Sequence, residues 1–375
     1  MLHFIPKKSV LWVVSLLLFF PTLPTWCQTY FDGLRIGWDF SSQKYVNAGV
    51  YARVKKLPDG KLAMVYSAGS DVYFVTSSDG GYKWSNLRQV SHDSKNVYNY
   101  TNSELIVLQN GKLMYAWNAR PNDESNPGGP YKIMAKYSAN NGLTWTGEQT
   151  LFTASTTSNE GCWEPAMVQL PSGELQLYFA NEYLVTNDNQ NISMMRSSDN
   201  GATWGNVEVV SFRSGSRDGM PVPLVLQNEK DLVLAIEDNG LSGTFKPVII
   251  HTTLSDNWAS GTVSGSSTNR WAALSSYETL ASSIYAGAPY LIQLSSGETL
   301  LSVQSGEDRQ TPGTLDHALM QVYVGSATAR GFLSKSTPFP FVDNESASVL
   351  WNNLCQINDS TVMAVSSISG LSANE

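Results

Sequence analysis

The sequence predicts an all-β fold, a six-bladed β-propeller built from four-stranded antiparallel blades. Three observations support this prediction. A polar turn flanked by apolar strands recurs six times, an octet recurs three times at a similar spacing, and no segment of useful length has helical periodicity. Six equivalent sheets that each bury two faces against their neighbours favour closure into a ring.

The first 28 residues are typical of a Sec-type export signal. Lys7 and Lys8 precede an apolar run at 10–20, which is short for a membrane span, and breaker residues follow at 21–28. We therefore expect cleavage near residue 28. The mature chain, 29–375, is then a single propeller domain without a membrane span, and we expect it to be secreted or periplasmic.

A short octet marks three of the expected blades. Its copies begin 61 and 59 residues apart, at Ser77–Trp84, Ser138–Trp145 and Ser197–Trp204. Each copy has the chemistry of a tight turn: an Asp or Asn side chain accepts backbone N–H groups, a Gly supplies positive φ, and the Trp packs onto the sheet. The fourth unit keeps only a partial copy, Ser255–Trp258. We expect these turns at the periphery and assign them no chemistry.

A second turn pattern is present in all six units, at a spacing of roughly 50–70 residues that suits four short strands. Asp-Gly, Asn-Gly and Ser-Gly between β-rich segments are hairpin signals. The six turns are Leu57–Leu62, Leu108–Leu113, Leu170–Leu175, Leu226–Leu232, Leu294–Leu300 and Ile357–Val362. Strand material between Phe31 and Val54 is expected to complete the last blade.

The repeat register predicts which side chains meet in the central channel, because equivalent positions of different blades form rings around it. Seven residues after the turn Gly, or its equivalent, lie Ser67, Asn118, Ala180, Glu237, Gln304 and Ser367. Seven to nine residues before the turn lie Arg53, Glu104 and Glu164. The end of one strand and the start of its antiparallel neighbour share an edge of the sheet. We therefore expect one channel mouth to bring together Arg53, Glu104, Asn118, Glu164, Glu237 and Gln304.

Two of these acids, Glu164 and Glu237, are the predicted catalytic pair. A glycosidase needs two carboxyl groups across the scissile bond: one protonates the leaving oxygen, and the other attacks the anomeric carbon or activates water. The acid must stay protonated near neutral pH, which requires burial or a like-charged neighbour. Glu104 is expected to raise a pKa in the pair or to bind a sugar hydroxyl, unless Arg53 or Arg120 simply neutralises it.

The predicted substrate contacts are Arg53, Glu104, Asn118, Trp163, Asp218 and Gln304. Trp163 offers a face for sugar stacking, although ordinary packing between blades also accounts for it. Asp218, in the segment Arg217–Pro221, either lines the cleft or belongs to a plain loop.

Composition narrows the classes of partner. A net charge of −8 and a pI near 5.1, with no basic run after residue 8, argue against nucleic acid. Cys162 and Cys355 are the cysteines of the mature chain, and His92, His251 and His317 lie far apart in the sequence. We therefore expect no metal ion and no cofactor. The expected partner is an oligo- or polysaccharide, and the expected state is a monomer.

The three octets are Asp-boxes, and together with the six turns they make the chain resemble the sialidase superfamily over nearly all of its mature length. Sialidases carry an Arg-Ile-Pro motif in the first blade and hold an anionic sugar with three arginines. Here Arg53 is followed by Val54 and Lys55 instead. No sequence motif identifies an arginine triad among the other arginines, such as Arg120, Arg217, Arg270 and Arg309.

Two short segments, Trp163-Glu164-Pro165 and Ile236-Glu237-Asp238, are more similar to glycoside hydrolase family 93. That family contains six-bladed, retaining, exo-acting α-L-arabinanases that release arabinobiose from arabinan. The resemblance implies a secreted enzyme with an α-L-arabinan-like substrate, in which Glu164 is the acid/base and Glu237 the nucleophile. Two other functions stay open, an exo-α-sialidase and a non-catalytic carbohydrate-binding propeller.

Overall fold

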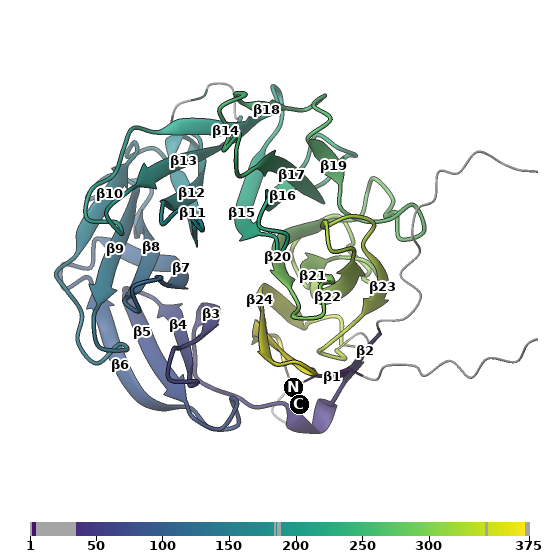
Figure 1. The fold of residues 1–375 in the computed structure, drawn as a ribbon, viewed down its shortest axis with the longest axis horizontal. Helices are drawn as coiled ribbons and strands as arrows, with labels where there is room; N and C mark the ends of the chain where they lie inside the picture. The colour runs from purple at the N-terminus through teal and green to yellow at the C-terminus, as the bar shows by residue number, and fades with distance from the viewer. Residues whose placement is uncertain (1, 5–34, 184, 186–188, 342–343, 372–375) are drawn as a thin grey trace, which may run out of the picture.

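The computed structural model describes residues 2–4, 35–183, 185, 189–341 and 344–371. Its blades are arranged in a ring around a common centre, as Figure 1 shows, and we call the space between the innermost strands the channel. The predicted export signal lies outside the described residues, except for Leu2–Phe4, which form strand β1. No helix in the described part of the chain is long and apolar enough to cross a membrane. The helices among these residues are two short 3-10 turns, η1 (Phe40–Ser42) and η2 (Ser158–Glu160).

Five blades have four or more strands, and each begins with the strand nearest the channel. The first two blades are formed by β3 (Val50–Lys56), β4 (Leu62–Ala68), β5 (Asp71–Ser77) and β6 (Ser85–His92), and by β7 (Tyr98–Val107), β8 (Leu113–Pro121), β9 (Lys132–Ser138) and β10 (Gln149–Thr153). The third blade consists of β11 (Cys162–Gln169), β12 (Leu175–Asn181), β13 (Asn191–Ser197), β14 (Glu208–Phe212) and the parallel β18 (Val263–Ser264).

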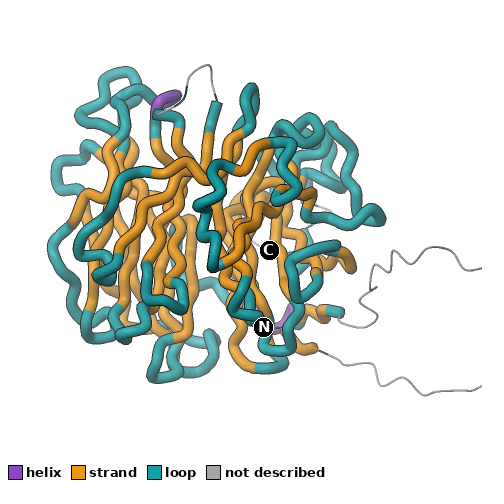
Figure 2. Tube along the Cα trace, turned by 45° about the horizontal axis from the view of Figure 1, so that its top comes forward, coloured by secondary structure: helices purple, strands orange, loops and turns teal. Residues whose placement is uncertain are grey.

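The next sheets follow the same order around the ring. The fourth blade consists of β15 (Asp218–Val225), β16 (Asp231–Asp238), β17 (Lys246–Thr253) and β19 (Arg270–Ala272), and the fifth of β20 (Ala286–Gln293), β21 (Thr299–Ser305), β22 (Leu319–Gly325) and β23 (Leu333–Ser336). At the sixth position, the described part of the chain forms a two-stranded sheet of β24 (Ser348–Asn358) and β25 (Thr361–Ser369). Figure 2 shows the strands running between two faces covered by loops.

The prediction of an all-β propeller with four-stranded antiparallel blades is confirmed, but the described residues form five complete blades and not six. The described residues supply only the first hairpin of the sixth unit. The expected completion of this sheet from residues 31–54 is wrong for the described part of that segment. β2 (Ile36–Trp38) pairs with β1 in a separate sheet, and β3 opens the first blade. Ile36 and Trp38 still pack on the core beside the sixth sheet.

The octets form the peripheral turns that the sequence predicts, between the third and fourth strands of three blades. In the first, Ser77 Oγ accepts from Gly81 N–H at 2.8 Å and Asp79 Oδ1 accepts from Lys83 N–H at 2.9 Å. Gly81 has φ +94°, which a residue with a Cβ rarely adopts. The other two octets repeat these bonds.

Every innermost strand carries a β-bulge, and every bulge holds a non-glycine residue with positive φ. These residues, which we call the bulge ring, are Tyr51, Asn102, Glu164, Met220, Ala288 and Trp351, with φ between 45° and 60°. A bulge re-aims the side chains around it. Side chains from four different sheets meet here, in a cluster of Tyr51, Met220, Ala288 and Trp351. The recurrence in β24 shows that the two-stranded sheet occupies a sixth radial position.

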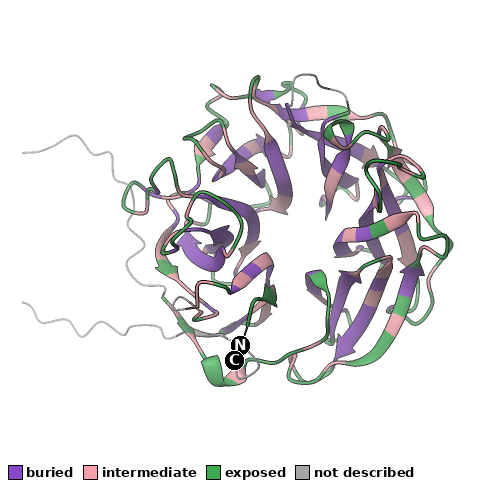
Figure 3. Cartoon of the chain, turned by 180° about the vertical axis from the view of Figure 1, so that it is seen from behind, coloured by how far each residue is buried: buried purple, intermediate pink, exposed green. Residues whose placement is uncertain are grey.

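Six apolar clusters lie between successive sheets around the ring. Burial is concentrated in the strands, and exposed residues lie mainly in loops and on the outer strands, as Figure 3 shows. Side chains of alternating strand positions face the two neighbouring sheets, so each blade is buried on both faces. This packing holds the innermost strands at fixed positions around the channel and so fixes the bulge ring.

Candidate active site

Glu164 and Glu237 are held by the blade that follows each of them. Glu164 lies in the bulge of β11, and its Oε2 accepts from Met220 N–H at 3.1 Å. Glu237 lies near the end of β16, and its Oε2 accepts from Ala288 N–H at 2.7 Å. Met220 and Ala288 are themselves members of the bulge ring. Both glutamates keep partial solvent exposure, although protein surrounds their carboxyl groups.

The two carboxyl groups flank one short backbone segment, Gly219–Met220. Gly219 stands opposite Glu237 in the β15–β16 ladder, and a Cβ built on it would lie 3.0 Å from Glu237 Oε1. Met220, the next residue, binds Glu164. On the other side of Glu237, a Cβ on Gly287 would collide with its Oε2. The structure therefore brings the predicted pair together, and two glycines leave room for the second carboxyl group.

The environments of Glu164 and Glu237 shift their pKa values to different extents. Burial raises the pKa of Glu237 to about 8, the negative charge of Glu164 adds to this rise, and the Ala288 N–H opposes it. Burial also raises the pKa of Glu164, but the positive charge of Arg120 opposes this rise. Two interacting carboxyl groups titrate as a unit, so the ionisation of one opposes the ionisation of the other. When the pair holds a single proton, the positive charges near Glu164 favour that proton on Glu237.

A tyrosine that the sequence analysis did not find lies beside Glu237. A Cβ built on Gly287 would meet Tyr285 Oη at 2.5 Å, and the same Cβ would collide with the Glu237 carboxyl group. Burial and the charge of Glu237 raise the pKa of Tyr285 well above its ordinary value, so it stays protonated. Its Oη accepts from Gln304 Nε2 at 2.9 Å. Tyr285 precedes β20 and falls outside the turn register, so no repeat signal pointed to it.

Two arginines place positive charge near Glu164. Arg120 donates to Asn118 Oδ1 at 2.7 Å and to Asn102 Oδ1 at 2.5 Å. Arg217 forms an ion pair with Glu182 and donates to a nearby glutamine amide. Both charges lower the pKa of Glu164 against the effect of burial. They favour an ionised Glu164 beside a protonated Glu237.

Arg53 and Glu104 do not join the pair. Glu104 is 6 % exposed and accepts from Arg53 Nε at 3.1 Å, with Lys55 Nζ at 3.2 Å from its other oxygen. Arg53 also donates to the backbone carbonyl of Trp351 at 3.3 Å. Glu104 lines a separate cavity of about 260 Å³ in the channel, with Tyr290 among its neighbours. This arrangement agrees with the alternative stated for Glu104 in the sequence analysis, namely that Arg53 neutralises its charge.

The ring of seventh-position residues links the blades to one another. Asn118 Nδ2 donates to Cys162 O at 2.8 Å, and Gln304 Oε1 accepts from Trp351 N–H at 3.0 Å. Ser367 Oγ accepts from Tyr51 N–H at 3.1 Å in the same way. Asn118 and Gln304 have no exposed surface. They position neighbours of the pair and are not placed to contact a substrate directly.

Trp163 and Asp218 are also used by the scaffold. The Arg120 guanidinium lies 4.6 Å from the Trp163 ring centroid, and the Tyr131 ring packs against Trp163 at 4.8 Å. Asp218 has no exposed surface, pairs with Arg270, and accepts from Ser211 Oγ at 2.6 Å. Asp218 is therefore closed to a ligand, whereas Trp163 keeps intermediate exposure beside Arg120 and Tyr131.

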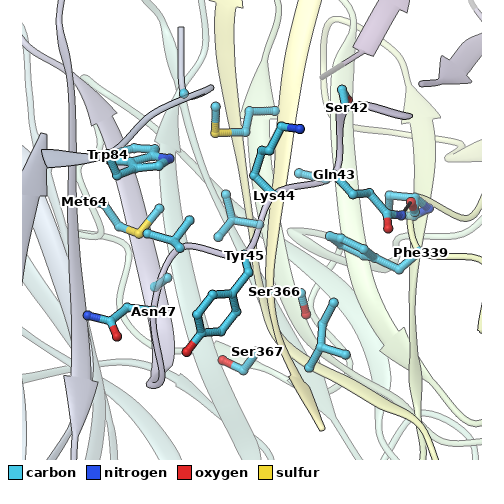
Figure 4. Close-up of a pocket in the computed structure, with 18 of the residues that line it drawn as sticks. Ser42, Gln43, Lys44, Tyr45, Asn47, Met64, Trp84, Phe339, Ser366 and Ser367 are labelled. Atoms are coloured by element: carbon cyan, nitrogen blue, oxygen red, sulfur yellow. Dashed lines mark hydrogen bonds between the residues drawn. The ribbon is translucent and has the colours of Figure 1, made fainter. Parts of the chain in front are cut away.

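The described residues contain no group of three His, Cys, Asp or Glu side chains that could hold a metal ion. Cys162 and Cys355 are both buried free thiols. A cavity of about 450 Å³ lies away from the pair, between β25 and the first blade. Its walls include Tyr45, Trp84 and Phe339, as Figure 4 shows.

Comparison with known proteins identifies the repeat. Residues 51–215 and 111–275 match the family model of the BNR repeat-like domain. No curated protein matches the sequence.

Several solved structures share the fold. The family 93 α-L-arabinofuranosidase of Fusarium graminearum, in complex with arabinobiose, has 18 % identity and a TM-score of 0.61, over 80 % of this chain and 84 % of that one. The α-L-arabinanase of Penicillium chrysogenum, complexed with arabinobiose, has 18 % identity and a TM-score of 0.57, over 88 % and 95 %. A variant of the NanB sialidase of Streptococcus pneumoniae has 10 % identity and a TM-score of 0.56, over 88 % and 66 %.

Proposed function

Because this chain belongs to the BNR repeat-like domain family and has the fold of the sialidase-superfamily propellers, we propose that it is a glycoside hydrolase. In this proposal it is an exported, exo-acting, retaining enzyme that acts on an α-L-arabinan-like polysaccharide. The observation that carries the proposal is the Glu164–Glu237 pair. The two carboxyl groups flank Gly219–Met220, they belong to residues that keep partial exposure, and burial raises the pKa of both.

In a retaining reaction, one carboxylate attacks the anomeric carbon and displaces the leaving oxygen, which the other carboxyl group protonates. Water then attacks the covalent glycosyl-enzyme, and the second group takes back a proton. The proposal requires one ionised and one protonated group at the same pH. Burial and mutual repulsion favour a protonated Glu237, and the positive charges of Arg120 and Arg217 favour an ionised Glu164, which together supply this difference.

The electrostatics of the free protein favour Glu237 as the proton donor and Glu164 as the nucleophile. Glu237 has a pKa near 8, and Arg120 and Arg217 favour the ionised form of Glu164. This order is the reverse of the one that the family resemblance implies. We propose the pair on geometry and assign the proton to Glu237 on electrostatics, and the two orders give different products in an experiment described below.

A sialidase would need three arginines around its anionic sugar. Arg53 is paired with Glu104, Arg270 with Asp218 and Asp238, and Arg309 donates to backbone carbonyls. Arg120 and Arg217 are left near Glu164. Tyr285 beside Glu237 provides the tyrosine that a sialidase site requires, but this charge pattern favours a neutral sugar.

The test is an assay of the purified mature chain on debranched arabinan, with sialyl-lactose as the competing substrate. We expect arabinan cleavage, and we expect Glu164→Gln and Glu237→Gln each to lower kcat by about 10²–10⁴-fold, the usual contribution of such groups. Glu208→Gln is the matched control, because Glu208 is exposed and pairs with Arg196 on the surface. Near-wild-type turnover in either variant of the pair, or cleavage of sialyl-lactose alone, would overturn the proposal.

A further inference from the structure

We propose that Trp351 is the platform on which a sugar ring stacks in this site, an inference that rests on the proposed glycoside hydrolase function. Trp351 is the bulge-ring residue of β24, in the incomplete sixth sheet. It was not among the residues that the sequence analysis singled out. Four observations about its surroundings lead to this assignment.

Trp351 belongs to the same apolar cluster as the residues that hold the two carboxyl groups. The cluster contains Tyr51, Met220 and Ala288, and Trp351 packs against it. The backbone N–H groups of Met220 and Ala288 bind Glu164 and Glu237. The indole ring and the two carboxyl groups therefore adjoin the same two residues, Met220 and Ala288.

The indole ring is the accessible end of a stack of side chains. Trp351 stacks on Tyr51 with ring centroids 5.4 Å apart and an angle of 27° between the planes. Tyr51 in turn has the Arg53 guanidinium 4.4 Å from its ring centroid. Tyr51 is only 4 % exposed, whereas Trp351 keeps intermediate exposure. The buried members of the stack therefore support Trp351 from behind and leave surface of the indole open.

The polar edge of Trp351 is also available to a ligand. Its indole N–H makes no hydrogen bond with any part of the described chain, and it is not among the buried polar atoms that lack a partner. It therefore contacts solvent. A sugar that covers the ring with its C–H face can also place a hydroxyl oxygen near this donor.

The position of Trp351 is fixed relative to the catalytic pair by hydrogen bonds. Its backbone N–H donates to Gln304 Oε1 at 3.0 Å, and Gln304 Nε2 donates to Tyr285 Oη at 2.9 Å. Tyr285 lies beside Glu237. A rigid platform loses little conformational entropy when a ligand binds, so such a chain favours tight and specific stacking.

Trp163, the tryptophan that the sequence favoured for stacking, also keeps intermediate exposure, but other side chains already pack on its ring. Arg120 covers its ring, Tyr131 packs against it, and its indole nitrogen is buried. A ligand would have to displace Arg120 to reach it. The two tryptophans therefore differ in role: Trp163 packs against Arg120, and Trp351 keeps an accessible ring surface.

The experiment compares Trp351→Leu and Trp351→Phe with the wild type on arabinan, and measures arabinobiose binding by calorimetry in a Glu164→Gln background. We expect Trp351→Leu to raise KM and the arabinobiose Kd about tenfold, as the loss of one aromatic stacking contact does. We expect kcat to change by less than about threefold, because a ground-state contact is lost. Trp351→Phe should recover most of the affinity. Thermal unfolding of each variant checks that the fold is kept.

Trp271→Leu is the matched control. Trp271 is a half-buried tryptophan on β19 with the Arg330 guanidinium 3.5 Å from its ring centroid, far out in the fourth blade. Its loss should leave KM and Kd unchanged. Unchanged KM and Kd in Trp351→Leu, with an active wild type, would overturn the platform alone. A wild type that neither cleaves arabinan nor binds arabinobiose would overturn the proposed function and the platform together.

Discussion

Replacing Glu237 with glutamine should make the protein more stable above neutral pH. Glutamine keeps the side-chain oxygen that accepts from Ala288 N–H, but it carries no charge to bury. In the wild type, the pKa of Glu237 rises from 4.5 to about 8 on folding, mainly through burial and then through the charge of Glu164. The folded protein therefore keeps a proton that the unfolded chain has already lost between these two pH values.

The sign of the pH dependence follows from this difference in bound protons. Where the folded state binds more protons than the unfolded state, the free energy of unfolding falls as pH rises. The stability that protonated Glu237 provides is complete below pH 4.5 and is lost as pH rises toward about 8. At about 1.4 kcal/mol for each pH unit, the full loss is about 5 kcal/mol. This figure is a ceiling, because partial solvent access screens the charge.

The assay is thermal unfolding of the wild type and Glu237→Gln in steps from about pH 4.5 to about pH 9. We expect similar midpoints at the acid end and a midpoint higher by roughly 5–10 °C in Glu237→Gln at the alkaline end. The difference between the two proteins removes the contribution of titrating groups outside the Glu164–Glu237 pair. Parallel curves across the whole range would refute the reasoning, because they would mean that Glu237 ionises with its ordinary pKa.

Two further predictions concern the pair. With an activated aryl arabinoside and azide, the variant that lacks the acid/base should give a glycosyl azide of retained configuration, and the variant that lacks the nucleophile should give the inverted product. We expect the retained azide from Glu237→Ala; its formation from Glu164→Ala instead would restore the order implied by the resemblance. Gly287→Ala should lower kcat at least about tenfold with the fold kept, because its Cβ would collide with the Glu237 carboxyl group. Gly147→Ala, where a Cβ meets nothing within 4 Å, is the control, and equal activity of the two alanine variants would contradict this account.

The fold and the register were predictable from the sequence because their signals are local. Each turn of the type Leu57–Leu62 fixes its own hairpin, so counting from the turn located the residues that link the blades, Gln304 among them. The same counting placed Glu237 at the end of its strand, at the channel mouth that was also expected to hold Glu164. The number of complete blades was not predictable in this way, because the turn at Ile357–Val362 specifies one hairpin and not a full sheet.

Three parts of the site needed coordinates. The residues of the bulge ring, such as Tyr51 and Trp351, have positive φ although none of them is a glycine, so the sequence does not signal these bulges. The fate of Glu104 depends on which cation reaches it, and Arg53 and Lys55 lie on a different blade. The choice between Trp163 and Trp351 depends on what covers each ring, which the sequence does not encode locally.

The catalytic pair occupies positions that the other blades use for structure. Gln304 and Ser367 each accept an N–H from the bulge residue of the next sheet, and Glu237 makes the same bond to Ala288. Ala180, the equivalent residue of the third blade, has no polar side chain, and Glu164 provides the bond to the next bulge instead.

An amide or a hydroxyl makes these links without carrying a charge, so the scaffold alone does not require an acid at either joint. The two carboxylates replace neutral groups at adjacent joints, and their burial and mutual repulsion destabilise the fold as pH rises. The charges of the two glutamates lower the stability of the fold, whereas Gln304 and Ser367 make the equivalent hydrogen bonds without this cost. A chemical role for Glu164 and Glu237 explains why acids occupy these two positions.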